Sequence, residues 1–203
     1  FVAVAIARAE VLRMGAFTLE MLKDAEISFL QGKTKHAELV LEKEPDIDEI
    51  CHQVNRFIDN IPADKLNAEE RATLGKLRHL VTDIERVGDH AVNLAEFAIQ
   101  MEKKTINITK YAHREIESLF SAVALHYAIA LKAFKKKDLK LMNQVVQNEA
   151  EVDKMERKFK KNHVERLRKG LCQPEADPIY VETLRNLERI SDHSLNIGWS
   201  LIY

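Results

Sequence analysis

The 203-residue sequence is poor in residues that interrupt helices and in residues that cross-link chains. It has six Gly and four Pro, and β-branched residues seldom follow one another, which argues against a sheet with many tight turns. Its two cysteines, Cys51 and Cys172, have neither metal-ligand spacing nor a CxxC arrangement. We therefore expect ordinary reduced thiols and a cytoplasmic setting, rather than a disulfide framework or a thiolate metal site.

The sequence also lacks a strong charge of either sign and a long apolar run. The formal net charge is −1 and the pI is about 6.8, so no basic balance points to nucleic acid as a partner. We find no stretch of about 20 apolar residues and expect no membrane span within the chain. Hydrophobic residues make up 46% and charged residues 31%, which suits amphipathic helices and predicts an all-α protein.

Apolar residues recur at helical spacing through most of the chain. The periodicity and the capping signals predict six helices, at about residues 7–30, 35–61, 67–101, 110–136, 138–168 and 178–203. Asn67 and Glu70 form a capping-box pattern, and Asp177 before Pro178 predicts the start of the last helix. Pro45 predicts a kink or a new helix start inside the second segment.

The two halves of the chain are copies of one pattern. Phe29 and Val40 have counterparts 105 residues later, at Phe134 and Val145. A repeat of half the chain length predicts a duplicated unit rather than a short-period solenoid. We therefore expect two tandem three-helix bundles, residues 1–104 and 105–203, related by a pseudo-twofold axis.

The clearest repeated element is an eleven-residue motif, found at residues 83–93 and again at residues 186–196. Each copy places two carboxylates and an amide on one i, i+4, i+8 stripe of a helix. The stripes are Glu85, Asp89 and Asn93 in the first copy, and Glu188, Asp192 and Asn196 in the second. Carboxylates stacked on one stripe repel each other, and a cation between them would relieve that repulsion.

A second acid pair recurs in the helix before each motif. These pairs are Glu44 with Asp48, and Glu149 with Asp153. One such pair usually lies on a solvated face, but four pairs at consistent offsets predict metal binding between the helices of a bundle. Oxygen ligands of this kind favour hard divalent or trivalent ions: Mg, Ca, Mn or Fe, with Zn also considered.

The remaining motif positions have less direct roles. His90 and His193 follow the second acid by one residue, about 100° round the helix, which favours an interhelix or second-shell hydrogen bond over direct metal ligation. Asn93 and Asn196 lie on the stripe and could ligate weakly or hold a water. The small residues Gly88 and Ser191 predict the close approach of another helix or of a metal cluster.

The duplicated motif resembles the signature of the PhoU family across essentially the whole chain. That resemblance implies two tandem three-helix repeats whose acid-x3-acid pairs are associated with bound metal ions. Carried over, it implicates first Glu85, Asp89, Glu188 and Asp192, and then Glu44, Asp48, Glu149 and Asp153. Pro45 departs from a plain helix at the first of the weaker pairs.

The segment from Ala7 to Gly15 resembles the junction that follows the membrane part of bacterial Na/phosphate cotransporters. With the missing initiator Met, this favours the cytoplasmic, regulatory domain of such a cotransporter, attached to its transporter part. The alternative is a free-standing PhoU protein that restrains phosphate uptake and phosphate-starvation signalling through contacts with a transporter and a sensor kinase. Either reading leaves a homo-oligomer open.

One charge run lies outside the motifs. Residues 154–169 contain eight Lys or Arg against two Glu. Most such runs are solvated helix faces. The functional interpretation is a surface that meets anionic lipid or an acidic partner.

Two other functional classes compete with metal-dependent regulation. A di-iron carboxylate enzyme needs two Glu-x-x-His motifs, and only Glu49 with His52 fits. A nucleophilic hydrolase has no nucleophile elbow or Gly-rich phosphate loop. We therefore expect no enzyme. A metal-free helical scaffold, in which the acid pairs only meet solvent, is the remaining alternative.

Overall fold

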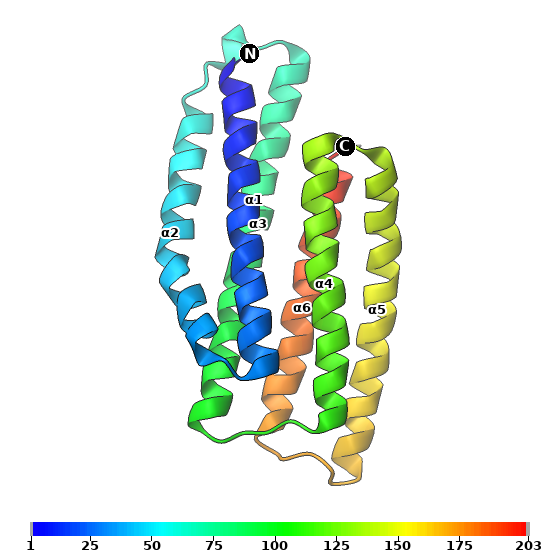
Figure 1. Cartoon of the computed structure of the whole chain (residues 1–203). Coiled ribbons are helices and arrows are strands. Elements are labelled where there is room, and N and C mark those ends of the chain that lie inside the picture. The colour runs from blue at the N-terminus through cyan, green and yellow to red at the C-terminus, as the bar shows by residue number, and fades with distance from the viewer. Residues whose placement is uncertain (1, 202–203) are drawn as a thin grey trace.

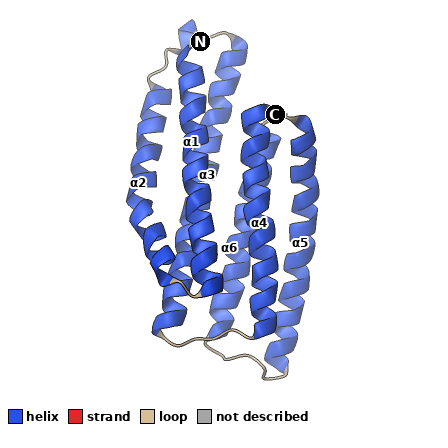
Figure 2. Cartoon of the chain, viewed as in Figure 1, coloured by secondary structure: helices blue, strands red, loops and turns tan. Residues whose placement is uncertain are grey.

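The computed structural model describes residues 2–201, and the described part is helical with no strand. Six α-helices and one short 3₁₀ turn follow one another (Figures 1 and 2). Their bounds are α1 Val2–Gln31, α2 Thr34–Asp59, η1 Ala63–Lys65, α3 Ala68–Lys103, α4 Lys110–Lys136, α5 Leu139–Arg168 and α6 Ala176–Trp199. The predicted all-α, six-helix architecture is confirmed.

The helices form two bundles that lie side by side. Helices α1, α2 and α3 pack together, as do α4, α5 and α6, while α1 with α4 and α3 with α6 join the two bundles. Figure 1 shows α2 and α5 at opposite outer edges of the molecule, and the α3–α4 connection crosses at the end away from both termini. Residues 104–109 form that connection, between the helices predicted to end near residue 101 and to begin near residue 110.

The helix ends follow the expected chemistry at most positions. The Asn67 side chain accepts a hydrogen bond from the Glu70 backbone N–H, and Glu70 returns one, so the capping box is confirmed. Gly32 and Gly170, both at φ +66°, follow α1 and α5 in the left-handed conformation that favours glycine. Lys137 ends α4 in the same conformation without being a glycine.

The structure decides between the two alternatives predicted for Pro45, and it corrects the predicted start of the last helix. Helix α2 continues through Pro45 instead of starting there, and Figure 1 shows its axis changing direction partway along, as expected where a backbone donor is lost. Helix α6 begins at Ala176, so Asp177 lies inside it and is not its N-cap. The Asp177 carboxylate instead accepts a hydrogen bond from His163 Nε2 at 2.5 Å.

Helix α4 also departs from the expectation that no segment could span a bilayer. By length and composition alone, α4 is apolar enough to cross a membrane. Half of its most apolar window is buried inside the protein, where α4 packs against α1, α5 and α6. Its apolar character therefore has a ready explanation as the inner wall of the second bundle.

Candidate functional site

The two motif copies face each other where α3 meets α6. His90 Nδ1 donates to Asn186 Oδ1 at 2.9 Å, and Asn93 Nδ2 donates to the same oxygen at 3.0 Å. Asn186 is the first residue of the second copy. The His and the Asn of one copy thus hold the first residue of the other.

The reverse contact is also made. His193 Nδ1 donates to Asp83 Oδ1 at 2.8 Å, and Asn196 Nδ2 approaches the same oxygen at 3.3 Å. The rings of His90 and His193 stack between the two contacts, with centroids 5.8 Å apart. The predicted interhelix hydrogen bonds of both histidines are confirmed, while metal ligation by these histidines and asparagines stays a prediction.

The eight predicted ligand residues fall into two groups, one in each repeat. The first acidic site comprises Glu44 and Asp48 of α2 with Glu85 and Asp89 of α3. The second acidic site comprises Glu149 and Asp153 of α5 with Glu188 and Asp192 of α6. Because each site draws on the second and third helices of its own repeat, neither combines residues of both repeats.

The carboxylates of the first acidic site have no direct partner within the described protein, although Arg86 and His52 oppose part of their negative charge. None of its four side chains takes part in a hydrogen bond or ion pair with another described residue. Burial and the charges of Asp89 and Asp48 raise the pKa of Glu85. Burial also raises the pKa of Asp89, as does Asp48, although Arg86 opposes the shift. The site is therefore a region of mutual repulsion open to a cation.

The pKa values of Glu44, another member of the first acidic site, and of the neighbouring Cys51 are raised as well. Burial raises the pKa of Glu44, and the charges of Asp48, Glu96 and Asp89 add to the shift. Cys51 lies buried nearby, and its pKa rises to about 12 because of burial and the charges of Glu85, Asp48 and Asp89. Its thiol stays protonated at neutral pH and offers no thiolate to a metal.

The second acidic site supplies its own donors. Glu149 is buried, and its Oε2 accepts hydrogen bonds from Ser191 Oγ at 2.5 Å and from His126 Nε2 at 3.1 Å. Burial alone would raise the pKa of Glu149, but the hydrogen bonds from His126 and Ser191 outweigh it and lower the pKa. Glu149 is thus held as a carboxylate without any metal.

The other three carboxylates of the second acidic site have raised pKa values. Burial, with the neighbouring Glu149, raises the pKa of Asp192 to about 6. Burial, with Glu156, raises the pKa of Glu188 to about 6. Lys160 pairs with the buried Glu156 and lies 4.0 Å from Glu188. Asp153 also has a raised pKa, from burial and the charge of Glu149.

Sequence reasoning missed the donors of the second site. At the repeat offsets, His126 corresponds to Met21 and Ser191 to Gly88, while Glu156 corresponds to Cys51. The differences between the repeats could have indicated these donors and acceptors. At each of the three positions, the second repeat has a side chain that forms strong hydrogen bonds and the first repeat has one that does not. Agreement between the repeats, which predicts the shared acid pairs, does not reveal such exchanges.

The small motif residues have different explanations. A Cβ added to Gly88 would lie 3.5 Å from Thr18 Cγ2 and 3.9 Å from Ile47 Cγ2, which are ordinary contacts. Gly88 therefore lies near α1 and α2, as predicted, but not so tightly that only glycine fits. Ser191 is small and also polar, and its hydroxyl serves Glu149.

The donor chemistry of the first acidic site suits a hard cation, but the side chains are not gathered round one point. Within residues 2–201, no group of three or more His, Cys, Asp or Glu side chains is arranged to hold a metal ion. Binding would require the surface carboxylates to turn toward each other. Such rotation is available to Asp48, which is exposed, and to Glu85 and Asp89, which are half-buried.

Comparison with known proteins follows the same two-repeat division. A family model described as the PhoU domain matches residues 11–98 and 116–200. A "Phosphate-specific transport system accessory protein PhoU homolog 1" of Thermotoga maritima is 30% identical over 202 residues, which cover 97% of this chain and 84% of that protein. A PhoU homolog of Pseudomonas putida is 28% identical over 209 residues, covering 97% and 76%.

Solved structures show the same architecture. The crystal structure of PhoU from Pseudomonas aeruginosa superposes with a TM-score of 0.90 at 25% identity, covering 100% of this chain and 96% of that one. A phosphate transport system regulatory protein PhoU from Streptococcus pneumoniae gives a TM-score of 0.88 at 18% identity, covering 98% and 93%. The second likeness concerns the fold alone.

Proposed function

The chain belongs to the PhoU family, and we propose that it is an accessory protein that regulates phosphate transport through protein contacts, without catalysing a reaction. The observation that carries this proposal is the likeness of both repeats to phosphate-transport accessory proteins over nearly the whole chain. Its place of action would be the cytoplasmic side of the membrane, beside the transporter.

The accessory-protein reading is better supported than the cotransporter-domain reading. The relatives from Thermotoga maritima and Pseudomonas putida both carry names of transport-system accessory proteins. The resemblance of residues 7–15 to a cotransporter junction is short by comparison, and those residues lie within the long helix α1. We therefore favour the free-standing regulator, which was the alternative at the sequence level.

Metal binding is the finer part of the proposal. The first acidic site would hold a hard divalent or trivalent ion through Asp48, Glu85 and Asp89, with Glu44 beside them. Support comes from the absence of hydrogen-bond and ion-pair partners for these carboxylates within the described chain and from the raised pKa values of Glu44, Glu85 and Asp89. A bound cation would relieve the repulsion and tie α2 to α3.

The regulatory proposal is tested in a bacterium whose own PhoU gene has been deleted. Expression of this chain should restore restraint of phosphate uptake in phosphate-rich medium, measured with radiolabelled phosphate. The transporter's cytoplasmic components should co-purify with the tagged chain. Uptake that stays unrestrained, with the protein folded and abundant, would contradict the proposal.

A matched pair of variants distinguishes the effect of the contact between the motif copies on regulation from the effect of losing any histidine. His193→Ala removes the contact to Asp83 between the motif copies, whereas His79→Ala alters an exposed histidine outside both copies. We expect the first variant to weaken restraint of uptake and the second to leave it unchanged. Circular dichroism establishes that both variants are folded.

A further inference from the structure

Helices α2 and α5 occupy equivalent places in the two repeats but carry opposite charge. Counting histidine as neutral, α2 has three Lys or Arg against seven Asp or Glu, a formal charge of −4. Helix α5 has eight against five, a formal charge of +3. Because the two helices lie at opposite outer edges (Figure 1), the molecule has one acidic and one basic side.

The contrast is strongest in the second half of α5. Residues 154–169 contain eight Lys or Arg against two Glu, whereas the equivalent residues 49–64 contain one Arg against three Asp or Glu. Four of these cations are exposed and form no ion pair with another described residue. They are Lys154, Arg157, Lys158 and Lys161. Their charges are turned to solvent, and only Arg157 has a resolved effect on a neighbouring carboxylate, Asp153.

Exposed apolar side chains lie among these cations. Val164 shares one helical stripe with Arg157, Lys161 and Arg168, and 59% of its surface is exposed. Leu171, just after the helix, is 60% exposed. An exposed valine within a stripe of cations, with an exposed leucine just beyond the helix, is not expected of a charge run that only meets solvent.

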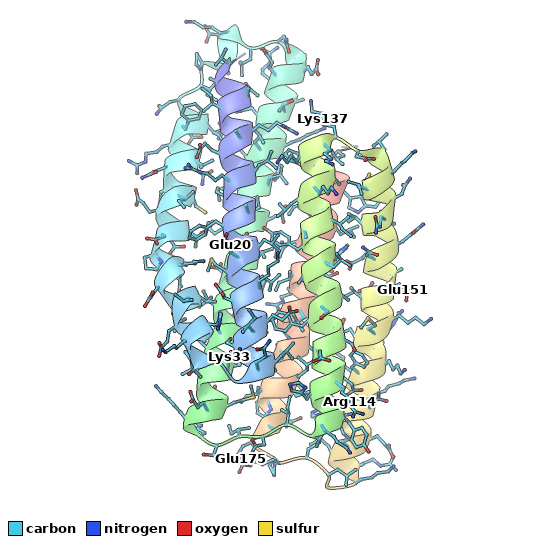
Figure 3. All side chains as sticks on the ribbon, viewed as in Figure 1. Glu20, Lys33, Arg114, Lys137, Glu151 and Glu175 are labelled. Carbon is cyan, nitrogen blue, oxygen red and sulfur yellow. The ribbon has the colours of Figure 1, made fainter. Side chains whose placement is uncertain are left out.

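The start of α4 extends the same surface. Tyr111, 58% exposed, lines a groove of about 600 Å³ together with Leu171, Lys110 and Arg114. Figure 3 labels Arg114 at this end of α4. Lys110 lies over the Tyr111 ring, 5.3 Å from its centre. Tyrosine beside Lys and Arg is the combination found where proteins meet the lipid–water interface.

We propose that this side of the protein rests on an anionic lipid bilayer. The basic face comprises Lys154, Arg157, Lys158, Lys161, Val164 and Arg168, with Tyr111 and Leu171 beside its lower end. Clustered cations would be held by anionic headgroups, while the apolar side chains enter the interface. The acidic α2 would point away from the lipid, since its charge is repelled.

An anionic bilayer fits this face better than an acidic protein does. Either occupant would attract the cations, but a bilayer also accepts scattered apolar side chains such as Val164 and Leu171 without a complementary pocket. The first acidic site would then face away from the membrane. The proposal goes beyond regulation of transport, and its failure would leave that function standing.

The test is co-sedimentation of the full chain with lipid vesicles. Vesicles of phosphatidylcholine alone should not retain the protein, while vesicles with roughly one third phosphatidylglycerol should retain it in about 50 mM salt. Raising the salt to about 500 mM should release most of it, because the attraction is screened.

A charge-reversal variant identifies the face. Exchange of all four unpaired cations, Lys154→Glu, Arg157→Glu, Lys158→Glu and Lys161→Glu, should lower partitioning a hundredfold or more, since each cation contributes about fivefold. The matched control reverses four exposed cations of the first repeat, Lys23, Lys33, Lys35 and Lys103, to Glu. The control changes the net charge of the protein by the same amount. If binding depends on the basic face, the control should therefore bind anionic vesicles far better than the charge-reversal variant does.

A fluorescence measurement reports the apolar contact without weakening it. Val164→Trp should shift to shorter emission wavelengths when anionic vesicles are added, because the ring leaves water. Leu39→Trp, on the acidic α2 and 42% exposed in the native protein, should show no such shift.

Three results would overturn the proposal. The first is no retention of the wild-type chain by anionic vesicles in low salt. The second is equal loss of binding in the charge-reversal variant and its control, which would indicate net charge alone. The third is low-salt self-association that disappears with either α2 or α5 charge reversal, which would assign the basic face to another copy of the chain.

Discussion

The first and second acidic sites occupy equivalent places in the two repeats, yet only the second contains its own hydrogen-bond donors. In the second site, His126 and Ser191 hold the buried Glu149 as a carboxylate. In the first, Met21 and Gly88 stand at the corresponding positions, and Glu44 has no such partner. Both repeats carry the same acid pattern, but only the second surrounds it with side chains that donate hydrogen bonds.

The difference has a consequence for ligand binding. A cation entering the second site would compete with donors that already satisfy Glu149, whereas a cation entering the first site would relieve repulsion only. The two sites should therefore differ in metal affinity despite their common motif.

Four predictions test the contrast between the two acidic sites, and they are given in order from the largest expected effect to the smallest.

Replacing His126 by Met, the residue of the first repeat, should destabilise the protein by about 2–4 kcal/mol, because Glu149 would keep its buried charge and lose a donor. Urea unfolding at neutral pH measures the loss. The double variant His126→Met with Glu149→Gln should recover part of it. A loss below about 0.5 kcal/mol would mean that His126 does not support the second site.

Metal should stabilise the protein mainly through the first acidic site. With Mn²⁺ at about a hundred times its dissociation constant, we expect a gain of up to about 2.7 kcal/mol in the free energy of unfolding. Asp48→Asn with Asp89→Asn should abolish the gain, and the matched pair Asp153→Asn with Asp192→Asn should leave most of it. Equal loss in both pairs would remove the distinction between the sites, and no metal effect on the wild-type protein would contradict metal binding at either.

The two small motif residues should respond with opposite signs to alanine. Ser191→Ala removes a hydrogen bond to buried Glu149 and should cost about 1–2 kcal/mol. Gly88→Ala adds a methyl group in ordinary contact distance of Thr18 and should stabilise by about 0.5–1 kcal/mol. Thermal unfolding measures both changes, and destabilisation by Gly88→Ala would reveal a tighter crossing than the structure has.

The smallest effect concerns pH. In metal-free protein, burial and the charge of Glu149 raise the folded-state pKa of Asp192 to about 6 from its ordinary value of 3.8, so the ionised form destabilises the fold. That penalty is full above pH 6 and is relieved as the pH falls toward 3.8, where the folded state takes up a proton first. Asp192→Asn should therefore raise stability most at pH 8 and progressively less toward pH 4, measured by melting temperature in a chelating buffer. A difference that does not depend on pH would rule out the raised pKa.

Much of the fold could be predicted because it depends on local patterns. Helical periodicity placed α4 at its observed bounds, Lys110–Lys136, and the capping box placed the start of α3. The 105-residue offset revealed the two bundles without any knowledge of packing. Asp177 was misjudged because the same side chain can cap a helix or accept from His163, and only the tertiary fold decides between them.

The sequence predicts which acidic residues group together, but it does not predict their pKa values or their hydrogen-bond partners. Periodicity places Glu85 and Asp89 on one stripe, while the absence of ion-pair partners depends on which side chains of α1 and α2 lie nearby. The role of Asn186 was also out of reach, because its partners His90 and Asn93 lie more than ninety positions away, on a helix whose neighbour the sequence does not specify.

The reciprocal contact between the motif copies has the form of an isologous interface, in which residue i of one partner meets residue j of the other and the reverse. Here both partners belong to one chain, and the pseudo-twofold axis passes near the stacked rings of His90 and His193. The contact between the two repeats therefore has the same form as the interface that two half-length chains would make in a homodimer. The two halves of this contact are not identical, because Asp83 stands in the first copy where Asn186 stands in the second, so His193 meets a carboxylate and His90 meets an amide.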